Sequence, residues 1–190
     1  MRLALFASGT GSNVQAVLDA IKAGKLTAEA ACLVCDQAGA KVIDKAKQAG
    51  VPYLVLSPKE CLNREDWEQH ILAFLKEHEV ELVVLAGFMR IIGKTILAAY
   101  PNKVLNIHPS LLPNFPGRHG IKDAFEADVS ETGVTVHYVD EGIDTGEIIM
   151  QETVKVASDW TLEQLETAIH KIEHVLYPTA IQTVIERGRN

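Results

Sequence analysis

The sequence has no long apolar run, few cysteines and fewer basic than acidic residues. A helix that spans a bilayer needs about 18 or more consecutive apolar residues, and no segment of the sequence meets this requirement. Met1 and Arg2 lead directly into the apolar stretch Leu3 to Ala7, without the basic segment and cleavage site of a secretion signal. We therefore expect a cytoplasmic protein that does not bind membranes.

Positive charge is also scarce. Lys and Arg number 18 against 25 Asp and Glu, so the formal net charge is -7 at pH 7. A surface that binds nucleic acid or an anionic membrane needs an excess of basic residues. The charge balance argues against a nucleic-acid partner, and any anionic ligand must be bound by a local site.

The three cysteines, Cys32, Cys35 and Cys61, are an odd number, which favours reduced thiols over a disulfide framework. Cys32 and Cys35 have the C-x-x-C spacing of a redox pair. They lie inside the apolar run Ala30 to Cys35, however, whereas a redox pair normally opens a helix. A second C-x-x-C for zinc is absent. The pattern predicts buried strand cysteines.

Short apolar segments alternate with segments of helical periodicity through the first half of the chain. Continuous apolar strands are typical of a parallel sheet that is covered on both faces, and helices between them are the crossovers of a doubly wound sheet. At 190 residues the chain is expected to form one domain. The expected strands are Leu3–Ala7, Ala30–Cys35, Tyr53–Leu56, Leu82–Ala86 and Val104–Ile107, and the expected helices include Val14–Ile21 and Trp67–His78.

The second half has a different pattern. Alternating apolar residues from Val134 to Tyr138 and the run Ile148 to Met150 predict two later strands at a mixed edge of the sheet. A long final helix is expected from about Thr161 to Arg187, with Ser158 or Asp159 as its cap. The predicted fold class is thus α/β, with a mostly parallel sheet, a mixed C-terminal edge and a long C-terminal helix.

The segment Ser8 to Asn13 reads SGTGSN and joins the first expected strand to the first expected helix. Glycines let the backbone approach a phosphate, and a helix N-terminus offers free N–H groups with partial positive charge. A dinucleotide fingerprint would need a third glycine where Val14 stands, although Asp36 suits its ribose acid. Phosphate binding of the mononucleotide type is favoured, with a dinucleotide or a plain tight turn as alternatives.

Asn106 and His108 lie at the carboxyl end of the fifth expected strand, the end at which open α/β sheets bind ligands. Alternation along a strand places both side chains on the same side. An amide stabilises an oxyanion, and an imidazole transfers a proton. The pair is therefore a candidate catalytic site, in a loop stiffened by Pro109 and Pro113; the alternative is a capped strand end with a solvated histidine.

The loop Val139 to Gly146 carries two glycines and three carboxylates, so one acid can turn inward beside a histidine. A carboxylate near His108 would favour its protonated form. The alternatives are a solvated acidic hairpin and a calcium loop, but the spacing matches no EF-hand. His170 and His174 are four residues apart on one helix without a third ligand nearby, so no metal site is expected.

These segments, together with Ala86 to Ile92, resemble in order and spacing the folate-dependent formyltransferases of purine biosynthesis. The resemblance covers essentially the whole chain and implies a Rossmann-like fold of one domain, residues 1–190. It implies that residues 1–100 bind a ribotide phosphate and that residues 101–190 carry the folate cleft and the chemistry. The cosubstrate would be 10-formyltetrahydrofolate, the acceptor the amine of glycinamide ribotide, and no metal would be needed. Oligomeric state is left open.

The resemblance also assigns roles to individual residues. Asn106, His108 and Asp144 match the family's catalytic trio. From the local sequence, Asn63 is expected to cap the helix that follows it. Arg64, in the first turn of this helix, is a cation that opposes the helix dipole. The resemblance gives Arg64 a role facing the folate carboxylates. The matched ribotide-binding residues are Gly11, Ser12, Asn13 and Glu173, and the matched folate-binding residues are Arg64, Met89, Arg90, Ile91, Ile92, Asn106, Asp140, Glu141, Gly142, Ile143 and Asp144.

Four other functions compete with this interpretation. Formyltetrahydrofolate deformylase and methionyl-tRNA formyltransferase share the catalytic core, but both carry a further domain, and the acidic charge offers tRNA no obvious surface. A non-catalytic nucleotide-binding module or a dehydrogenase would instead use Gly9, Gly11 and Asp36.

Overall fold

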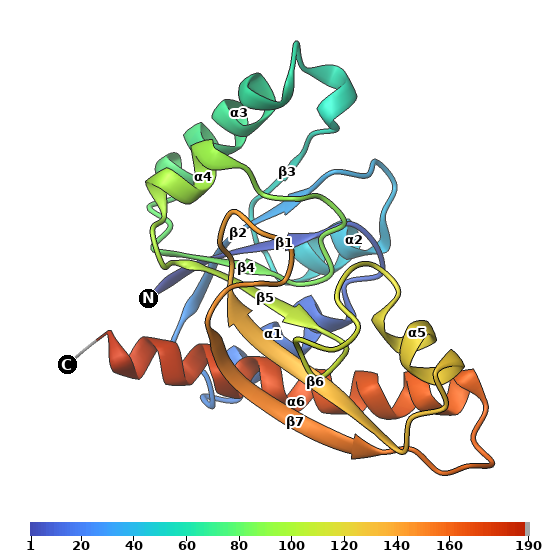
Figure 1. Cartoon of the computed structure of the whole chain (residues 1–190). Coiled ribbons are helices and arrows are strands. Elements are labelled where there is room, and N and C mark those ends of the chain that lie inside the picture. The colour runs from blue at the N-terminus through green and yellow to red at the C-terminus, as the bar shows by residue number, and fades with distance from the viewer. Residues whose placement is uncertain (189–190) are drawn as a thin grey trace. The chain divides into compact units, whose positions relative to one another are not determined.

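The computed structural model describes residues 1–188, which form two compact units, Met1–Leu105 and a second from Asn106 onward (Figure 1). The strand order in the sheet is β3 (Tyr53–Val55), β2 (Glu29–Cys35), β1 (Arg2–Ala7), β4 (Leu82–Leu85), β5 (Val104–His108), β6 (Glu131–Tyr138) and β7 (Ile148–Lys155). The boundary between the units falls inside β5 (Val104–His108).

The first unit contains a parallel sheet in which β1 pairs with both β2 and β4, and β2 pairs with β3. β1, β2 and β4 are largely buried because their side chains are apolar on both faces, as in Leu3 to Ala7. The elements are β1 (Arg2–Ala7), α1 (Ser12–Lys22), β2 (Glu29–Cys35), α2 (Lys41–Gln48), β3 (Tyr53–Val55), the 3-10 helix η1 (Pro58–Glu60), α3 (Arg64–Glu77), β4 (Leu82–Leu85) and α4 (Lys94–Ala99).

An aromatic cluster lies in the core of this unit. Trp67 stacks on Phe88 with ring centroids 6.2 Å apart, and Phe88 forms a T-shaped pair with Phe6 with ring centroids 5.2 Å apart. The indole Nε1 of Trp67 donates to the carbonyl oxygen of Leu56 at 3.0 Å, so its polar atom is satisfied. The cluster joins α3 to β1 and to the segment after β4.

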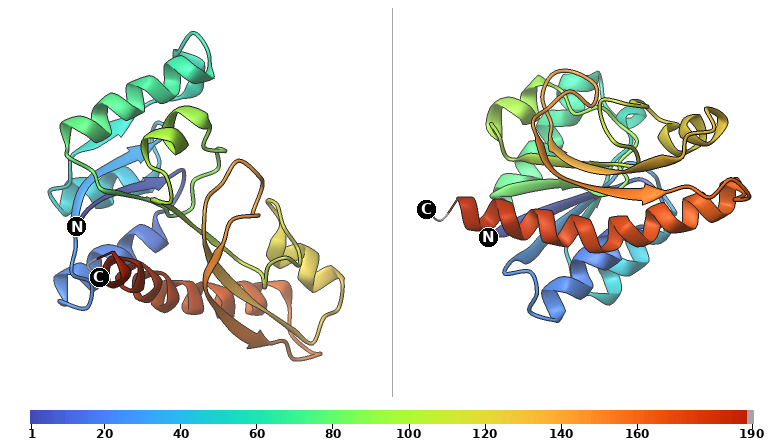
Figure 2. Two further views of the ribbon diagram at one scale, coloured as in Figure 1. Left: turned by 60° about the vertical axis from the view of Figure 1, so that its left-hand side comes forward. Right: turned by 60° about the horizontal axis from the view of Figure 1, so that its bottom comes forward.

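The second unit combines an antiparallel strand pair with two helices, α5 (Gly120–Glu126) and α6 (Leu162–Arg187). β6 (Glu131–Tyr138) pairs with β7 (Ile148–Lys155), and α6 packs along both strands (Figure 2). Thr161 and Gln164 form the capping box of α6. The expected caps, Ser158 and Asp159, were therefore wrong by two or three residues.

The predicted fold class is confirmed, including the mixed edge and the long last helix. Asn63 caps α3 as expected, since its Oδ1 accepts the N–H of Asp66 at 2.9 Å. The strand cysteines are buried, and burial raises the pKa of the Cys32 thiol to about 12, against the action of Arg2. Such a thiol is not a redox nucleophile. Among residues 1–188, none of the helices has the length and apolar character needed to cross a membrane.

Candidate functional site

In the first unit, the loop between β1 and α1 has the form of an anion-binding turn. Gly11 adopts a left-handed conformation with φ of 74°, and a Cβ there would lie 2.8 Å from Cβ of Val42. Both facts require glycine. The helix starts at Ser12 with no acidic residue in its first turn and no side-chain cap. Its N-terminus therefore suits an anion, as the loop sequence predicts.

Asp36, at the end of β2, is buried and already has three hydrogen-bond donors. Its carboxylate accepts from Ser8 Oγ at 2.5 Å and from Arg90 Nε at 2.7 Å, with Gln37 Nε2 at 3.1 Å. Burial alone would raise the pKa of this carboxyl, but the bonds from Ser8, Arg90 and Gln37 outweigh burial and lower it. A carboxylate held in this way does not face a ribose, which counts against the dinucleotide alternative.

The segment after β4 and the first turn of α3 contact each other within the same unit. Arg64 Nη2 donates to the carbonyl oxygen of Ile91, and Arg64 Nε lies 3.4 Å from Glu68 Oε1. The buried Glu68 also accepts the N–H of Gly93 at 2.6 Å. Met89 and Ile91 are exposed, whereas Ile92 is buried. The structure thus joins Arg64 to one of the residues with which it shares a predicted folate-binding role.

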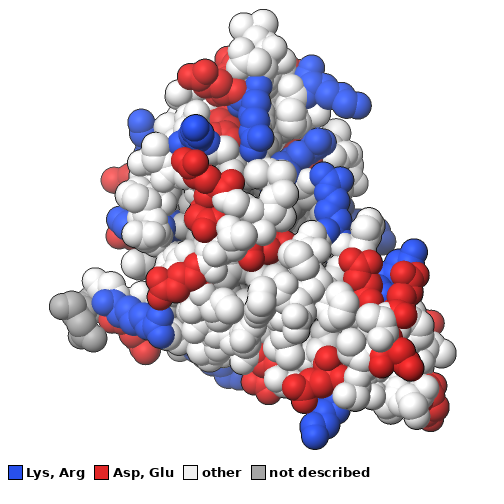
Figure 3. All heavy atoms as spheres, viewed as in Figure 1, with Lys and Arg blue, Asp and Glu red and all other residues white. Residues whose placement is uncertain are grey.

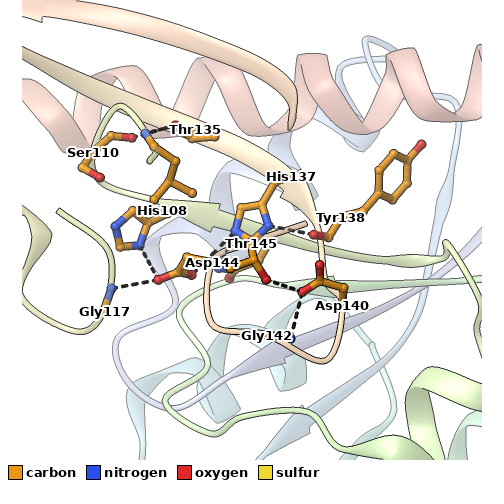
Figure 4. Close-up of polar contacts among 12 residues, drawn as sticks. His108, Ser110, Gly117, Thr135, His137, Tyr138, Asp140, Gly142, Asp144 and Thr145 are labelled. Atoms are coloured by element: carbon orange, nitrogen blue, oxygen red, sulfur yellow. Dashed lines mark hydrogen bonds and ion pairs between the residues drawn. The ribbon is translucent and has the colours of Figure 1, made fainter. Parts of the chain in front are cut away.

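In the second unit, Asp144 lies between two buried histidines (Figure 4). Its Oδ2 is 3.6 Å from His108 Nδ1 and accepts the N–H of Gly117 at 2.8 Å, while its Oδ1 is 3.7 Å from His137 Nε2. His137 Nε2 is also 3.3 Å from Asn106 Nδ2. Asp144 therefore contacts His108 directly, and His137 links Asn106 to Asp144.

The hydrogen-bond partners of each ring show which of its nitrogens carries a proton. A carbonyl oxygen only accepts, so His137 donates from Nδ1 to the oxygen of Tyr138 at 2.7 Å. In the neutral ring Nε2 then accepts from Asn106, which orients the amide. Burial lowers the pKa of His137, and it outweighs the opposing effects of the Tyr138 bond and Asp144. This ring is therefore neutral at pH 7.

His108 donates from Nε2 to the carbonyl oxygen of Phe115 at 2.7 Å, so its Nδ1 faces the carboxylate of Asp144. A Cβ at Gly120 would lie 3.1 Å from the same Nε2. Both ring nitrogens of His108 therefore face protein groups in this conformation, and the turn that carries Phe115 covers the ring.

The acidic loop before β7 is a tight turn that carries Asp144. Asp140 Oδ1 accepts the N–H of Gly142 at 2.9 Å and the hydroxyl of Thr145 at 2.7 Å. A side chain at Gly142 would collide with Thr145, and Asp144 itself has a positive φ of 54°. Glu141 and Ile143 are exposed. The turn thus directs Asp144 inward and leaves other residues on the surface.

Glu173 is a buried carboxylate on α6, and its Oε2 lies 2.9 Å from Nδ1 of the half-exposed His170. The hydrogen bond from Glu173 raises the pKa of His170, against the effect of burial. Within residues 1–188 one group of side chains has metal-ligand character, Cys61, Asp66 and His70. Asp66 Oδ2 already accepts the N–H of Leu62, and His70 Nδ1 bonds the Asp66 carbonyl, so these side chains serve the start of α3.

A family model described as formyl transferase matches residues 1–181. The chain belongs to the formyl transferase family. Over 97% of its length it is 48% identical to phosphoribosylglycinamide formyltransferase of Bacillus subtilis (strain 168), and it covers 94% of that protein. Over 100% of its length it is 39% identical to the trifunctional purine biosynthetic protein adenosine-3 of Homo sapiens, of which it covers only 19%.

Solved structures of other family members have the same fold. The crystal structure of phosphoribosylglycinamide formyltransferase from Bacillus halodurans superposes with a TM-score of 0.96 at 47% identity, over 99% of this chain and 97% of that one. Glycinamide ribonucleotide transformylase 1 from Geobacillus kaustophilus gives a TM-score of 0.94 at 52% identity, over 96% and 97% of the two chains. The family resemblance read from the motifs is confirmed.

Sequence reasoning assigned no role to His137, although it contacts two of the three predicted catalytic residues. The apolar alternation from Val134 to Tyr138 predicts the strand and its apolar face but says nothing of the other face. Thr135 and His137 lie on the other face, and both are buried. Buried polar residues that alternate with valines were the signal that could have identified His137.

Proposed function

We propose that the chain transfers the formyl group of 10-formyltetrahydrofolate to the amine of 5'-phosphoribosylglycinamide in purine biosynthesis. The observation that carries the proposal is the placement of Asp144 between His108 and His137, with Asn106 on the second ring. An amide donor can stabilise the developing oxyanion, and an imidazole beside a carboxylate can transfer the proton, which are the two tasks of acyl transfer to an amine. The named relatives support the same reaction.

In the proposed mechanism the amine nitrogen attacks the formyl carbon, and the carbonyl oxygen of the resulting tetrahedral centre becomes negative. Asn106 Nδ2 and a protonated His108 stabilise that oxygen. Because His108 Nε2 donates to Phe115 in the present conformation, the turn at Phe115 must release this N–H for the reaction. In this role the Nε2–H of His108 leaves the carbonyl oxygen of Phe115 and donates to the developing oxyanion instead.

The reaction also needs one proton moved. The attacking nitrogen loses a proton, N10 of the folate gains one, and the carbon–N10 bond breaks to release tetrahydrofolate. His108, or a water held by Asp144, relays this proton. His137 acts as a neutral acceptor that orients the Asn106 amide. No step calls for a metal ion.

We infer the binding roles from the family resemblance and from local geometry. Gly11, Ser12 and Asn13 bind the ribotide phosphate, a role supported by the left-handed Gly11 and the acid-free first turn of α1. Glu173 contacts the ribose or amine side of the ribotide. The proposed folate-binding residues are Arg64, Met89, Arg90, Ile91, Ile92, Asn106, Asp140, Glu141, Gly142, Ile143 and Asp144.

We further propose that residues 1–190 act as one formyltransferase domain in the cytoplasm, with small molecules as partners. Residues 1–100 would supply the phosphate half, and residues 101–190 the folate and catalytic half. On the face shown in Figure 3, Lys and Arg side chains are interspersed with Asp and Glu. The mixture and the net charge of -7 favour small substrates over nucleic acid.

The test is to follow tetrahydrofolate formation by absorbance when the purified protein is mixed with 10-formyltetrahydrofolate, with and without phosphoribosylglycinamide. The proposal predicts turnover only when the ribotide is present. Equal turnover without the ribotide would identify a hydrolase of the deformylase type. A thermal-shift comparison of NAD with the two substrates tests the dehydrogenase alternative, which predicts stabilisation by NAD.

A further inference from the structure

Three side chains in the first unit are linked by hydrogen bonds around the buried carboxylate of Asp36, an arrangement that we name the Asp36 clasp: Ser8, Asp36 and Arg90. Asp36 accepts from Ser8 through Oδ1 and from Arg90 through Oδ2, at 2.5 and 2.7 Å. The Asp36 side chain is 0% exposed and that of Arg90 38%. Hydrogen bonds to a charged group at these distances are among the strong ones in proteins.

The sheet topology explains why these residues meet. β1, β2 and β4 are neighbouring parallel strands, with Ala7 opposite Cys35 and Phe6 opposite Leu85. Parallel strands end at the same edge of a sheet, so the residues that follow them emerge side by side. Ser8 follows β1, Asp36 follows β2, and the segment that carries Arg90 follows β4.

Ser8 makes two further contacts with the segment after β4. Its hydroxyl oxygen accepts the N–H of Met89 at 2.9 Å, and its own N–H donates to the carbonyl oxygen of Gly87 at 3.0 Å. Ser8 is also the first residue of the Ser8–Asn13 loop. One hydroxyl therefore connects the proposed phosphate loop with the proposed folate-binding residues Met89 and Arg90.

We propose that Asp36 is a positioning residue that couples binding of the ribotide phosphate at the Ser8–Asn13 loop to binding of the folate at Met89–Ile92. The inference rests on the proposed function of these two segments. A ligand that orders the loop also fixes Ser8, and through Asp36 it fixes Arg90 and its neighbours. The second ligand then orders less of the chain when it binds. Such coupling is reciprocal, so each substrate raises the affinity of the other by the same factor.

A purely structural role for the clasp makes a different prediction. Removal of one partner of a buried ion pair destabilises a fold whatever its function. Loss of stability therefore does not distinguish the two roles. The ratio of ribotide affinities with and without folate does, because a structural defect that leaves the site folded does not change this ratio.

The experiment is calorimetric titration of phosphoribosylglycinamide into the protein, alone and with saturating tetrahydrofolate, which has no formyl group to transfer. Wild type is expected to bind the ribotide about 5-fold or more tightly with the folate present, the lower range of typical allosteric coupling. In Asp36→Asn and Ser8→Ala the factor should fall toward one. Ser8→Thr keeps the hydroxyl and should retain the wild-type coupling factor.

Glu29→Gln is the matched control. It breaks the 2.7 Å ion pair between Glu29 and Arg2, which joins the same two strands, β1 and β2, at their opposite ends. This variant should retain the wild-type coupling factor.

Ser8→Ala carries the test if Asp36→Asn does not fold. A factor near one in wild type, or an unchanged factor in the clasp variants while both ligands bind, would overturn the role of the clasp alone. Failure of wild type to bind either ligand would remove the proposed function and the clasp's role with it.

Discussion

Asp144 faces both buried histidines of the catalytic cluster, with Oδ2 3.6 Å from His108 Nδ1 and Oδ1 3.7 Å from His137 Nε2. The two rings carry a proton on different nitrogens. His137 carries its proton on Nδ1, toward Tyr138, whereas His108 carries one on Nε2, toward Phe115. Either ring therefore attracts Asp144 only when it carries a second proton and is positively charged. Burial lowers the pKa of His137 and so disfavours the charged form of that ring.

Replacement of Asp144 by Asn keeps the shape of the side chain and removes the charge that faces His108. We expect kcat to fall by about 100-fold, the low end of effects attributed to positioned acid–base groups, while both substrates still bind. Steady-state kinetics with circular dichroism of the variant measures this. Asp140→Asn is the control in the same turn, and it should alter KM for the folate more than kcat. Equal effects of the two substitutions would refute a special role for Asp144.

Asn106→Ala removes the amide that His137 orients. If Asn106 stabilises the developing oxyanion, kcat should fall by about 100-fold or more, the scale of one lost oxyanion donor. The measurement is kcat and KM for both substrates. A change confined to KM would make Asn106 a binding residue.

Ser12→Asp places a carboxylate at the first residue of α1, where we propose that the ribotide phosphate binds. Repulsion between the two anions should weaken ribotide binding much more than folate binding. Separate titrations with each ligand test this, with Ser12→Asn as the uncharged control. An equal loss of both affinities would rule out the phosphate assignment.

The buried neutral His137 predicts a pH dependence of stability. Its folded pKa is lowered by burial, so the unfolded chain binds the proton first as pH falls. Its contribution is fully present above the unfolded pKa of about 6.5 and is lost as pH falls from there toward the lower folded value. The free energy of unfolding in urea should therefore fall more steeply for wild type than for His137→Gln as the pH is lowered from 7.5 to below the folded pKa of His137. A difference in stability that does not vary with pH would show that His137 is not held neutral.

The sequence predicts the strands well because buried parallel strands need continuous apolar runs, such as Leu3 to Ala7. It did not predict α2, α4 or α5, which have 6 to 8 residues each. α2 buries only Val42, Ile43 and Ala46, which span little more than a single helical turn, and so short a segment does not distinguish a helix from a loop in the sequence alone.

Polar contacts between residues distant in sequence were harder to predict. The contact of His137 with Asn106 joins residues 31 apart, and that of Arg90 with Asp36 joins residues 54 apart. Strand pairing and loop conformation create these contacts, and neither leaves a local pattern. The acidic loop indicated that one carboxylate turns toward a histidine, but not that a second ring lies on its other side.

The most direct test of the proposed reaction is to follow the formyl carbon itself. The protein is supplied with 10-formyltetrahydrofolate labelled with ¹³C in the formyl group and with phosphoribosylglycinamide, and the products are identified by NMR and mass spectrometry. Direct transfer predicts that the label appears in the formyl amide of the ribotide, with tetrahydrofolate formed in equal amount and little labelled formate. Label that accumulates as formate while the ribotide stays unmodified would contradict the account.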